Sequence, residues 1–283
     1  MQAMVRMPFL SRPPRVAVLR LQGVIAATGS RGTLSHARIS PLIERAFRKG
    51  NPVAVALAVN SPGGSPAQSS LIAAHIRRLA EETGVPVHAF VEDAAASGGY
   101  WLACAADDIW IDESSITGSI GVISSGFGLH EAIARHGIER RVHTAGQDKS
   151  MLDPFRPERP EDVERLKAIQ GRIHERFIEY VTARRGDRLD RGRDDLFTGE
   201  IFVGRAAVDA GLVDGVAHLG SKLRELYGPK VRTVPLAPAR PLLVRLMPGV
   251  SAASPGAGGL GADLASGALD AVEARAQWAR LGL

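Results

Sequence analysis

Ser97 lies in a stretch of small residues whose order suits a nucleophile, Glu92-Asp-Ala-Ala-Ala-Ser-Gly-Gly-Tyr-Trp101. An apolar run typical of a strand precedes it, and an apolar run typical of a helix follows it. A serine at such a turn lies near a helix N-terminus, where unpaired N–H groups and the helix dipole favour developing negative charge. Gly98 and Gly99 have no Cβ, so a substrate backbone can approach closely. The stretch predicts a nucleophile beside an oxyanion donor, although taken alone such a turn more often serves close packing.

A second glycine pair could complete an oxyanion site. The loop Asn60-Ser-Pro-Gly-Gly64 directly follows a continuous apolar run over residues 52–60, which is typical of a buried parallel strand. Binding crevices of α/β sheets lie at such strand ends. We expect the N–H groups of Gly63 and Gly64 to point outward and to supply a second oxyanion donor, which would pair with the N–H of Gly98. For the loop taken by itself an ordinary tight turn is the slightly better interpretation, but Ser97 in the same sheet favours the functional one.

A serine nucleophile also needs a base, and Lys149 is the leading candidate. Of the 35 basic residues only five are lysines, and arginine cannot act as a base because it stays protonated. Lys149 lies in a loop between Gly146 and Pro154, where a solvated lysine would be the simpler interpretation without the other motifs. A lysine base must be neutral, which burial can achieve by lowering an ammonium pKa by up to ~3–5 units. His130, which opens a predicted helix after a glycine-rich loop, is the rival, and no carboxylate partner is evident for it.

The elements that must position these residues alternate between strand and helix. Alternation of this kind predicts an α/β fold with a mainly parallel sheet and helical crossovers. Strands are predicted over 16–21, 52–60, 85–91, 108–112, 117–123 and 139–144, and helices over 40–49, 66–82, 100–106, 129–136, 160–184 and 205–210. We divide the chain into an N-terminal arm (1–14), an α/β domain (15–230) and a Pro/Gly-rich tail (231–283) whose residues 264–281 regain helical periodicity.

Composition excludes several other classes of function. The chain has 283 residues and a formal charge of +5, but its basic residues are interspersed with acids and no nucleic-acid motif accompanies them. A single cysteine, Cys104, excludes a disulfide framework, and neither a metal-ligand cluster nor a nucleotide-binding loop is present, so we expect no cofactor or metal. No signal peptide or apolar run of about 18 residues occurs. We therefore expect a cytoplasmic protein, or one with peripheral contact to the cytoplasmic membrane.

Five motifs taken together resemble the signal peptide peptidase A family, serine peptidases of the S49 type with a ClpP/crotonase-like fold. The resemblance runs over about residues 16–228, and the motifs occur in family order. They are Asn60-Ser-Pro-Gly-Gly64, Asp93-Ala-Ala-Ala-Ser-Gly-Gly-Tyr100, Thr117-Gly-Ser-Ile-Gly-Val122, Lys149-Ser150 with Pro154-Phe-Arg156, and Phe197-Thr-Gly-Glu-Ile-Phe-Val-Gly-Arg-Ala-Ala-Val-Asp-Ala-Gly-Leu-Val-Asp214.

The resemblance implies Ser97 as nucleophile, Lys149 as general base, and Gly64 and Gly98 as oxyanion donors. It also implies a ring-shaped homo-oligomer, in which the lysine can come from a neighbouring protomer. Two departures matter. Typical members carry an N-terminal membrane anchor, which we do not expect in this protein, and this argues against cleaved signal peptides as substrates. The C-terminal extension lies outside the motifs.

The sequence therefore predicts a serine endopeptidase with a Ser97–Lys149 dyad, acting on extended or membrane-derived peptides such as signal-peptide remnants. Two alternatives share the fold. One is a crotonase-like acyl-CoA enzyme, which would use the two amides without a nucleophile. The other is a non-catalytic ring-forming scaffold at a membrane surface, which would be expected to have lost Ser97 or Lys149.

Overall fold

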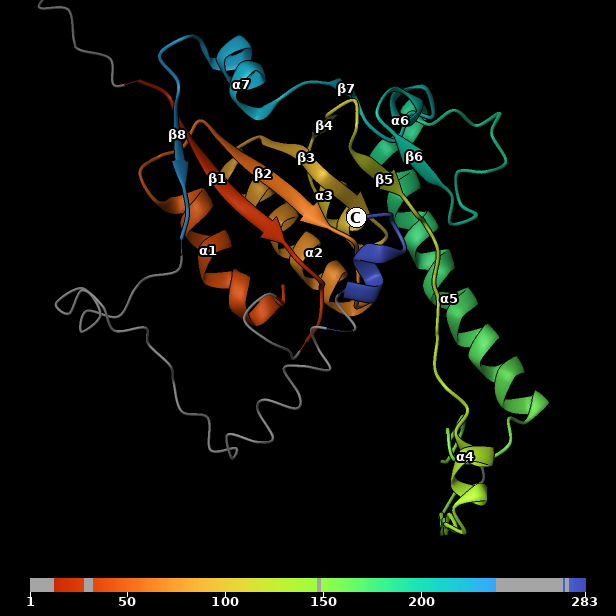
Figure 1. The fold of residues 1–283 in the computed structure, drawn as a ribbon. Coiled ribbons are helices and arrows are strands. Elements are labelled where there is room, and N and C mark those ends of the chain that lie inside the picture. The colour runs from red at the N-terminus through yellow and green to blue at the C-terminus, as the bar shows by residue number, and fades with distance from the viewer. Residues whose placement is uncertain (1–12, 28–32, 147–148, 238–271, 273–274) are drawn as a thin grey trace, which may run out of the picture.

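A computed structural model describes residues 13–27, 33–146, 149–237, 272 and 275–283. Its centre is an eight-stranded sheet with the order β6-β5-β3-β2-β1-β8; β4 also pairs with β3, and β7 pairs with β4 (Figure 1). All pairs are parallel except β5 with β6, which confirms the predicted mainly parallel sheet. The strands are β1 (Arg15–Gln22), β2 (Ala54–Ser61), β3 (Val87–Ala96), β4 (Asp108–Ile111), β5 (Ile116–Gly118), β6 (Ile201–Val203), β7 (Gly215–Val216) and β8 (Arg232–Pro235).

Helices cover both faces of the sheet unequally. Three helices, α1, α2 and α3, lie together on one face, and the long α5 runs beside α3, while α7 lies on the opposite face (Figure 1). The central strand β2 is buried along its whole length, as expected of a parallel strand covered on both faces. The helices are α1 (His36–Arg48), α2 (Pro66–Thr83), α3 (Gly98–Ala103), α4 (His130–Arg135), α5 (Pro160–Arg185), α6 (Arg205–Asp209) and α7 (Leu219–Tyr227), and a 3-10 turn, η1 (Gly186–Arg188), follows α5.

Several predicted boundaries differ from those observed. Residues 139–144 form no strand, because they lie on an exposed projection with no neighbouring strand to pair with. Strand β8 falls within the predicted tail and pairs with β1 at the edge of the sheet, where the missing N–H of Pro235 is tolerated. The predicted helix over 264–281 lies mostly outside the described residues, and residues 275–279 are helical. None of the described helices is both long and apolar enough to cross a membrane.

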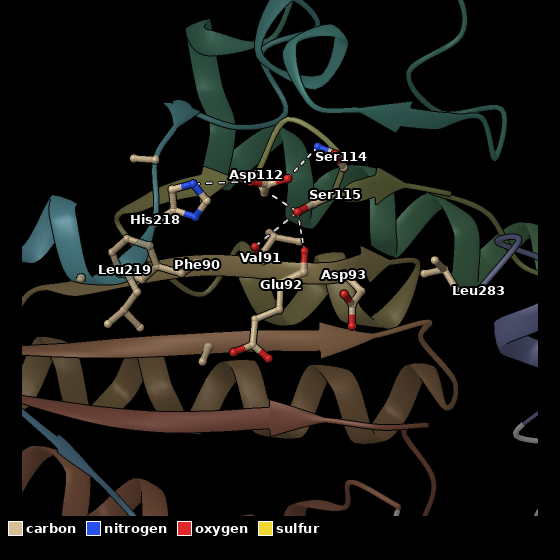
Figure 2. Close-up of a pocket in the computed structure, with 13 residues that line it drawn as sticks. Phe90, Val91, Glu92, Asp93, Asp112, Ser114, Ser115, His218, Leu219 and Leu283 are labelled. Atoms are coloured by element: carbon tan, nitrogen blue, oxygen red, sulfur yellow. Dashed lines mark hydrogen bonds and ion pairs between the residues drawn. The ribbon is translucent and has the colours of Figure 1, made fainter.

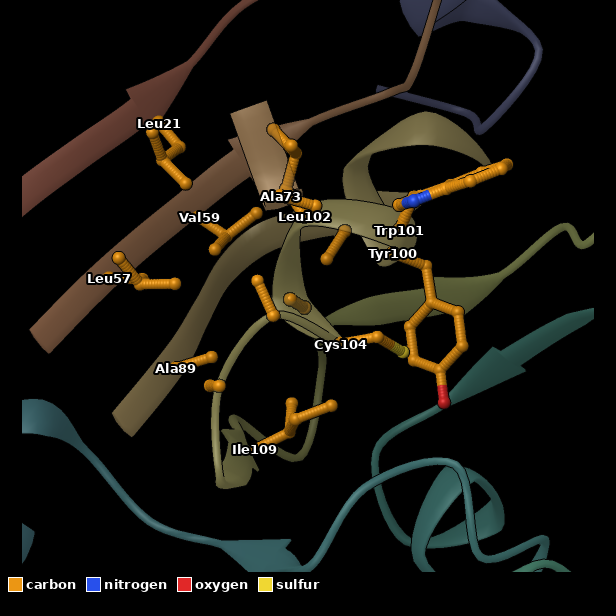
Figure 3. Close-up of a cluster of buried hydrophobic side chains, with 14 of the residues drawn as sticks. Leu21, Leu57, Val59, Ala73, Ala89, Tyr100, Trp101, Leu102, Cys104 and Ile109 are labelled. Atoms are coloured by element: carbon orange, nitrogen blue, oxygen red, sulfur yellow. The ribbon is translucent and has the colours of Figure 1, made fainter. Parts of the chain in front are cut away.

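The main core lies between the sheet and the helices α1, α2 and α3. Figure 3 shows Leu57 and Val59 of β2 facing Ala73 of α2, with Cys104 and Tyr100 of the α3 region at the other end of the same cluster. The Tyr100 hydroxyl donates to Leu212 O at 2.7 Å, so α3 is held to the chain beyond α6. Helix α3, which follows Ser97, is thus buried in the centre of the molecule rather than attached to its surface.

Cys104 is expected to resist alkylation in the folded protein. Burial raises the pKa of its thiol to about 11, so the reactive thiolate is scarce at pH 8. Iodoacetamide followed by intact mass measurement should show no adduct in native buffer and one adduct in denaturant. Rapid labelling of the native protein would contradict the burial of α3.

A buried ion pair holds the end of α5 against the sheet. Arg185, 3% exposed, donates to Asp214 at 2.7 Å and to Gly211 O at 2.9 Å. Burial acts to raise the pKa of Asp214, but the hydrogen bond and charge of Arg185 outweigh it and keep that pKa below its usual value. Because the folded-state pKa is depressed, the pair stabilises the protein above the ordinary Asp pKa, and this contribution is lost as the pH falls through the lowered value.

Arg185→Ala is expected to reduce the free energy of unfolding by about 3–5 kcal/mol, because it removes a buried guanidinium and leaves the partly buried Asp214 carboxylate with Arg188 and Ile109 N as its remaining partners. Arg191→Ala is the matched control: Arg191 pairs with Asp187 on the surface at 3.1 Å, and exposed pairs contribute about 0–1 kcal/mol. Urea unfolding at pH 7 measures both variants. Equal losses in the two would show that burial of the pair is unimportant.

Candidate active site

Ser97 occupies a strained turn between β3 and α3. Its backbone has φ 52° and ψ −120°, a conformation that is rare for residues other than glycine. Two hydrogen bonds hold it: Ser97 N donates to Gly118 O at 2.9 Å, and Ser97 O accepts from Trp101 N at 3.0 Å. Such strain costs about 1–3 kcal/mol and is concentrated at functional sites. The Ser97 hydroxyl makes no hydrogen bond to any described residue, so it is available for chemistry.

A bulge in β3 brings Ser97 beside the glycine loop. The pairing of β2 with β3 shifts between Val59–Val91 and Ser61–Ala95. Asn60 fastens the bulge, since its Nδ2 donates to Asp93 Oδ2 at 2.6 Å and its Oδ1 accepts from Ala94 N at 3.3 Å. Bulges redirect a strand locally. Here the first half of β3 pairs with β4 and the last residues pair with β5, so the strand ends next to the 60–64 loop.

The backbone amides of Gly64 and Gly98, the two expected oxyanion donors, lie close together. Neither N–H donates to any described residue, and a Cβ atom at Gly98 would lie 3.4 Å from the Gly64 nitrogen, so the two groups are neighbours. The loop is fixed by Ile25, whose N donates to Gly63 O at 2.8 Å and whose O accepts from Ser65 N at 2.7 Å. Two fixed, unpaired amides beside a serine hydroxyl are the elements of an oxyanion hole.

Gly63 has a different part in this arrangement from the one expected from the sequence. Its N–H does not point outward but donates to Ser61 Oγ at 3.2 Å. Its φ of 108° suits glycine, and a Cβ here would lie 2.9 Å from the Cβ of Ser97. Gly63 therefore allows the loop to approach the nucleophile rather than donating to a substrate.

The structure does not bring Lys149 to Ser97 within one chain. Lys149 is exposed, and Leu152 of the same loop donates from its N to Asp162 in the first turn of α5 at 3.5 Å. Phe177, which lies beside Ser97, is about four helical turns further along α5, roughly 22 Å at 1.5 Å per residue. The rival base His130, the first residue of α4, lies on the same projecting segment (Figure 1).

This segment forms an arm that leaves the body of the molecule. We define the arm as residues 121–156; after β5 the chain runs away from the sheet to α4 and returns to the start of α5 (Figure 1). None of its described residues is buried. It exposes large apolar side chains, among them Ile123 at 69% and Phe127 at 86%. Exposed apolar groups gathered on one segment are typical of a protein–protein contact surface.

A small apolar hollow adjoins Ser97. Its volume is about 10 Å³, and Trp101 and Phe177 close it, stacked with ring centroids 4.7 Å apart. Trp101 also stacks on Tyr180 at 5.1 Å. The sequence motifs do not indicate that these aromatic residues belong to the site. Trp101 could have been found from its position one helical turn after Ser97, whereas nothing local to α5 indicates that Phe177 reaches the site.

A larger cavity than this hollow lies elsewhere in the molecule. Its volume is about 590 Å³, and it lies on the sheet face opposite α1, α2 and α3, with Glu92, Asp112 and His218 at its wall (Figure 2). Glu92 is paired with Arg20 at 2.9 Å, and Asp112 accepts from Ser114 N at 2.8 Å and lies 3.5 Å from His218. Ser97 does not line this cavity, so choosing the candidate active site by cavity volume alone would place it away from Ser97.

Comparison with known proteins agrees with this geometry. The chain belongs to peptidase family S49, whose model matches residues 80–226, a range that includes Ser97 and Lys149. A mutant of the 1510-N membrane-bound stomatin-specific protease, solved with a substrate peptide, has a related fold, with a TM-score of 0.50 and 17% sequence identity, covering 84% of this chain and 97% of that one. The fold is that of the S49 proteases, as the sequence motifs predicted.

Curated relatives carry different names. A protein named Na(+)/H(+) antiporter NhaA, from Brucella abortus, is 47% identical over 95% of this chain, which spans only 37% of that protein's length. A protein named putative signal peptide peptidase SppA, from Enterococcus faecium, is 29% identical over 77% of this chain and 64% of that protein's length. Protease 4 from Haemophilus influenzae is 31% identical over 78% of this chain and 35% of its own.

Proposed function

We propose that this protein is a serine endopeptidase in which Ser97 is the nucleophile and Lys149 the general base. One observation carries the proposal: the strained Ser97 at the start of α3 lies beside the amides of Gly64 and Gly98, and neither its hydroxyl nor these amides hydrogen-bond to a described residue. A nucleophile and its oxyanion donors are thereby arranged before substrate arrives.

The proposed reaction has two stages. Neutral Lys149 takes the Ser97 proton as Oγ attacks the peptide carbonyl, and the N–H groups of Gly64 and Gly98 stabilise the oxyanion. The resulting ammonium returns its proton to the leaving amine, which leaves an ester on Ser97. A water molecule then attacks the ester and gives its proton to Lys149. Lys149 passes this proton to Ser97 Oγ as the acid product leaves, which restores the free serine and the neutral lysine.

Lys149 would act on the Ser97 of a neighbouring protomer in a homo-oligomeric ring. The arm supports this, because it carries Lys149 away from its own active site while exposing Ile123 and Phe127. Packing of the arm on a neighbour would bury those side chains and would also place the lysine in a drier environment. A head-to-tail contact of this kind generates a closed ring when the rotations between successive subunits add up to a full turn.

The substrate would be an extended peptide that adds a strand beside the nucleophile. The run from 121 to 128 begins at the hollow, and its amides donate no backbone hydrogen bond to any described residue. A free backbone edge of this kind suits recognition by strand addition. Membrane-derived peptides such as signal-peptide remnants are the class we propose, following the relative named as a putative signal peptide peptidase.

A serine-directed phosphonate tests this function. We expect one adduct per active site, located on the peptide that contains Ser97, together with loss of peptide hydrolysis. A crotonase-like acyl-CoA enzyme or a scaffold would show neither. Absence of both labelling and hydrolysis in the assembled protein would overturn the proposal.

A further inference from the structure

The hollow beside Ser97 has room for only a very small group. A volume of about 10 Å³ is close to the minimum that holds one water molecule, which is also about the size of a methyl group. Side chains from distant parts of the chain line it: Pro66 from α2, Trp101 from α3, Val122 from the arm, and Ile173 and Phe177 from α5.

This hollow lies where a bound substrate would place the side chain of the residue on the N-terminal side of the scissile bond. With the carbonyl carbon at Ser97 Oγ and its oxygen between the amides of Gly64 and Gly98, the adjoining α-carbon and its substituent remain within a few ångströms of those three residues. All three line the hollow. It therefore adjoins the position of the residue on the N-terminal side of the cleaved bond.

The hollow cannot enlarge easily. Trp101 is 7% exposed and lies flat against both Phe177 and Tyr180, with interplanar angles of 21° and 18°. Phe177 is 3% exposed and belongs to the main core. Moving either ring would open voids in a close-packed interior, which resists such changes.

We propose that the Trp101–Phe177 stack restricts cleavage to peptide bonds preceded by glycine, alanine or serine. This inference rests on the proposed peptidase function and names its substrate class. A leucine at that position would have to displace the aromatic stack or leave its side chain outside the hollow, and either would misalign the carbonyl.

The test compares two peptides that differ only in alanine or leucine before the scissile bond. We expect wild-type kcat/KM to favour the alanine peptide by about 100-fold, as steric exclusion from a small apolar pocket allows. Ile173→Ala, at the half-buried wall of the hollow, should reduce this ratio by about 10-fold through faster cleavage of the leucine peptide. Ile169→Ala, one helical turn earlier and 46% exposed, is the matched control and should leave the ratio unchanged.

Phe177→Leu provides a second variant that keeps the site apolar, and it should shift the ratio in the same direction as Ile173→Ala. Equal wild-type cleavage of both peptides, or a ratio that neither variant changes, would overturn the size restriction while the peptidase function stood. A wild-type protein that neither cleaves any peptide nor reacts at Ser97 with a phosphonate would instead overturn the peptidase proposal, and this inference with it.

Discussion

Ser97→Ala is expected to abolish peptide hydrolysis, lowering kcat by about 10⁴-fold or more. Without Oγ no acyl-enzyme can form. The amides of Gly64 and Gly98 could then assist only the direct attack of water on the peptide carbonyl. The variant should fold normally, because alanine is close in size to serine and the hydroxyl makes no hydrogen bond to a described residue. Hydrolysis of a fluorogenic peptide and phosphonate labelling measure the effect, with far-UV circular dichroism to confirm the fold.

Ser119→Ala is the matched control for this substitution. Ser119 also has a positive φ, 49°, and follows the neighbouring strand β5 as Ser97 follows β3. It should retain near wild-type hydrolysis and phosphonate labelling. If Ser97→Ala kept its activity, or if both serine variants lost it equally, the assignment of Ser97 as nucleophile would fail.

Lys149→Ala and Lys149→Arg are both expected to be inactive, because neither side chain can accept the Ser97 proton at neutral pH. Lys167→Ala and Lys167→Arg, on the exposed surface of α5, are the controls and should remain active. Activity in Lys149→Arg would exclude a general-base role for Lys149.

Mixing two inactive proteins tests whether Lys149 acts on a neighbour. When Ser97→Ala and Lys149→Ala protomers are co-refolded in equal amounts, random assembly into a head-to-tail ring should restore about a quarter of the sites, because each site takes its serine and lysine from different subunits. Mass measurement of the oligomer confirms that mixed assemblies form. If mixed rings have no activity, Lys149 does not act between subunits.

The local pattern of residue types in the sequence was enough to predict the parts of the candidate active site that adjoin Ser97. The alternation of strands and helices predicted the parallel sheet, and parallel strands present their carboxyl ends at one edge, so the loops after β2 and β3 could be expected to meet. The long helix predicted over 160–184 is α5, Pro160–Arg185. Its amphipathic pattern indicated a buried face but could not tell which part of the core that face would contact.

Features that depend on contacts between residues far apart in the chain could not be predicted from the local sequence pattern. Residues 139–144 have the composition of a strand, but a strand exists only when a partner supplies its hydrogen bonds. The Pro-containing sequence of β8 resembles a loop, yet β1 has a free edge that accepts it. The outward direction expected for the Gly63 amide failed for a similar reason, since Ser61 Oγ lies close enough to accept it.

The sequence by itself therefore determined the class of fold and the identities of Ser97, Gly64 and Gly98 as candidates, because these depend on residue type, chain direction and spacing. Only the tertiary structure decided how the groups meet: the bulge that directs Ser97 toward the loop, the aromatic residues of α5 that limit the hollow, and the arm that carries Lys149 away. Such contacts join residues far apart in the chain, and their geometry depends on how whole elements pack rather than on any local sequence.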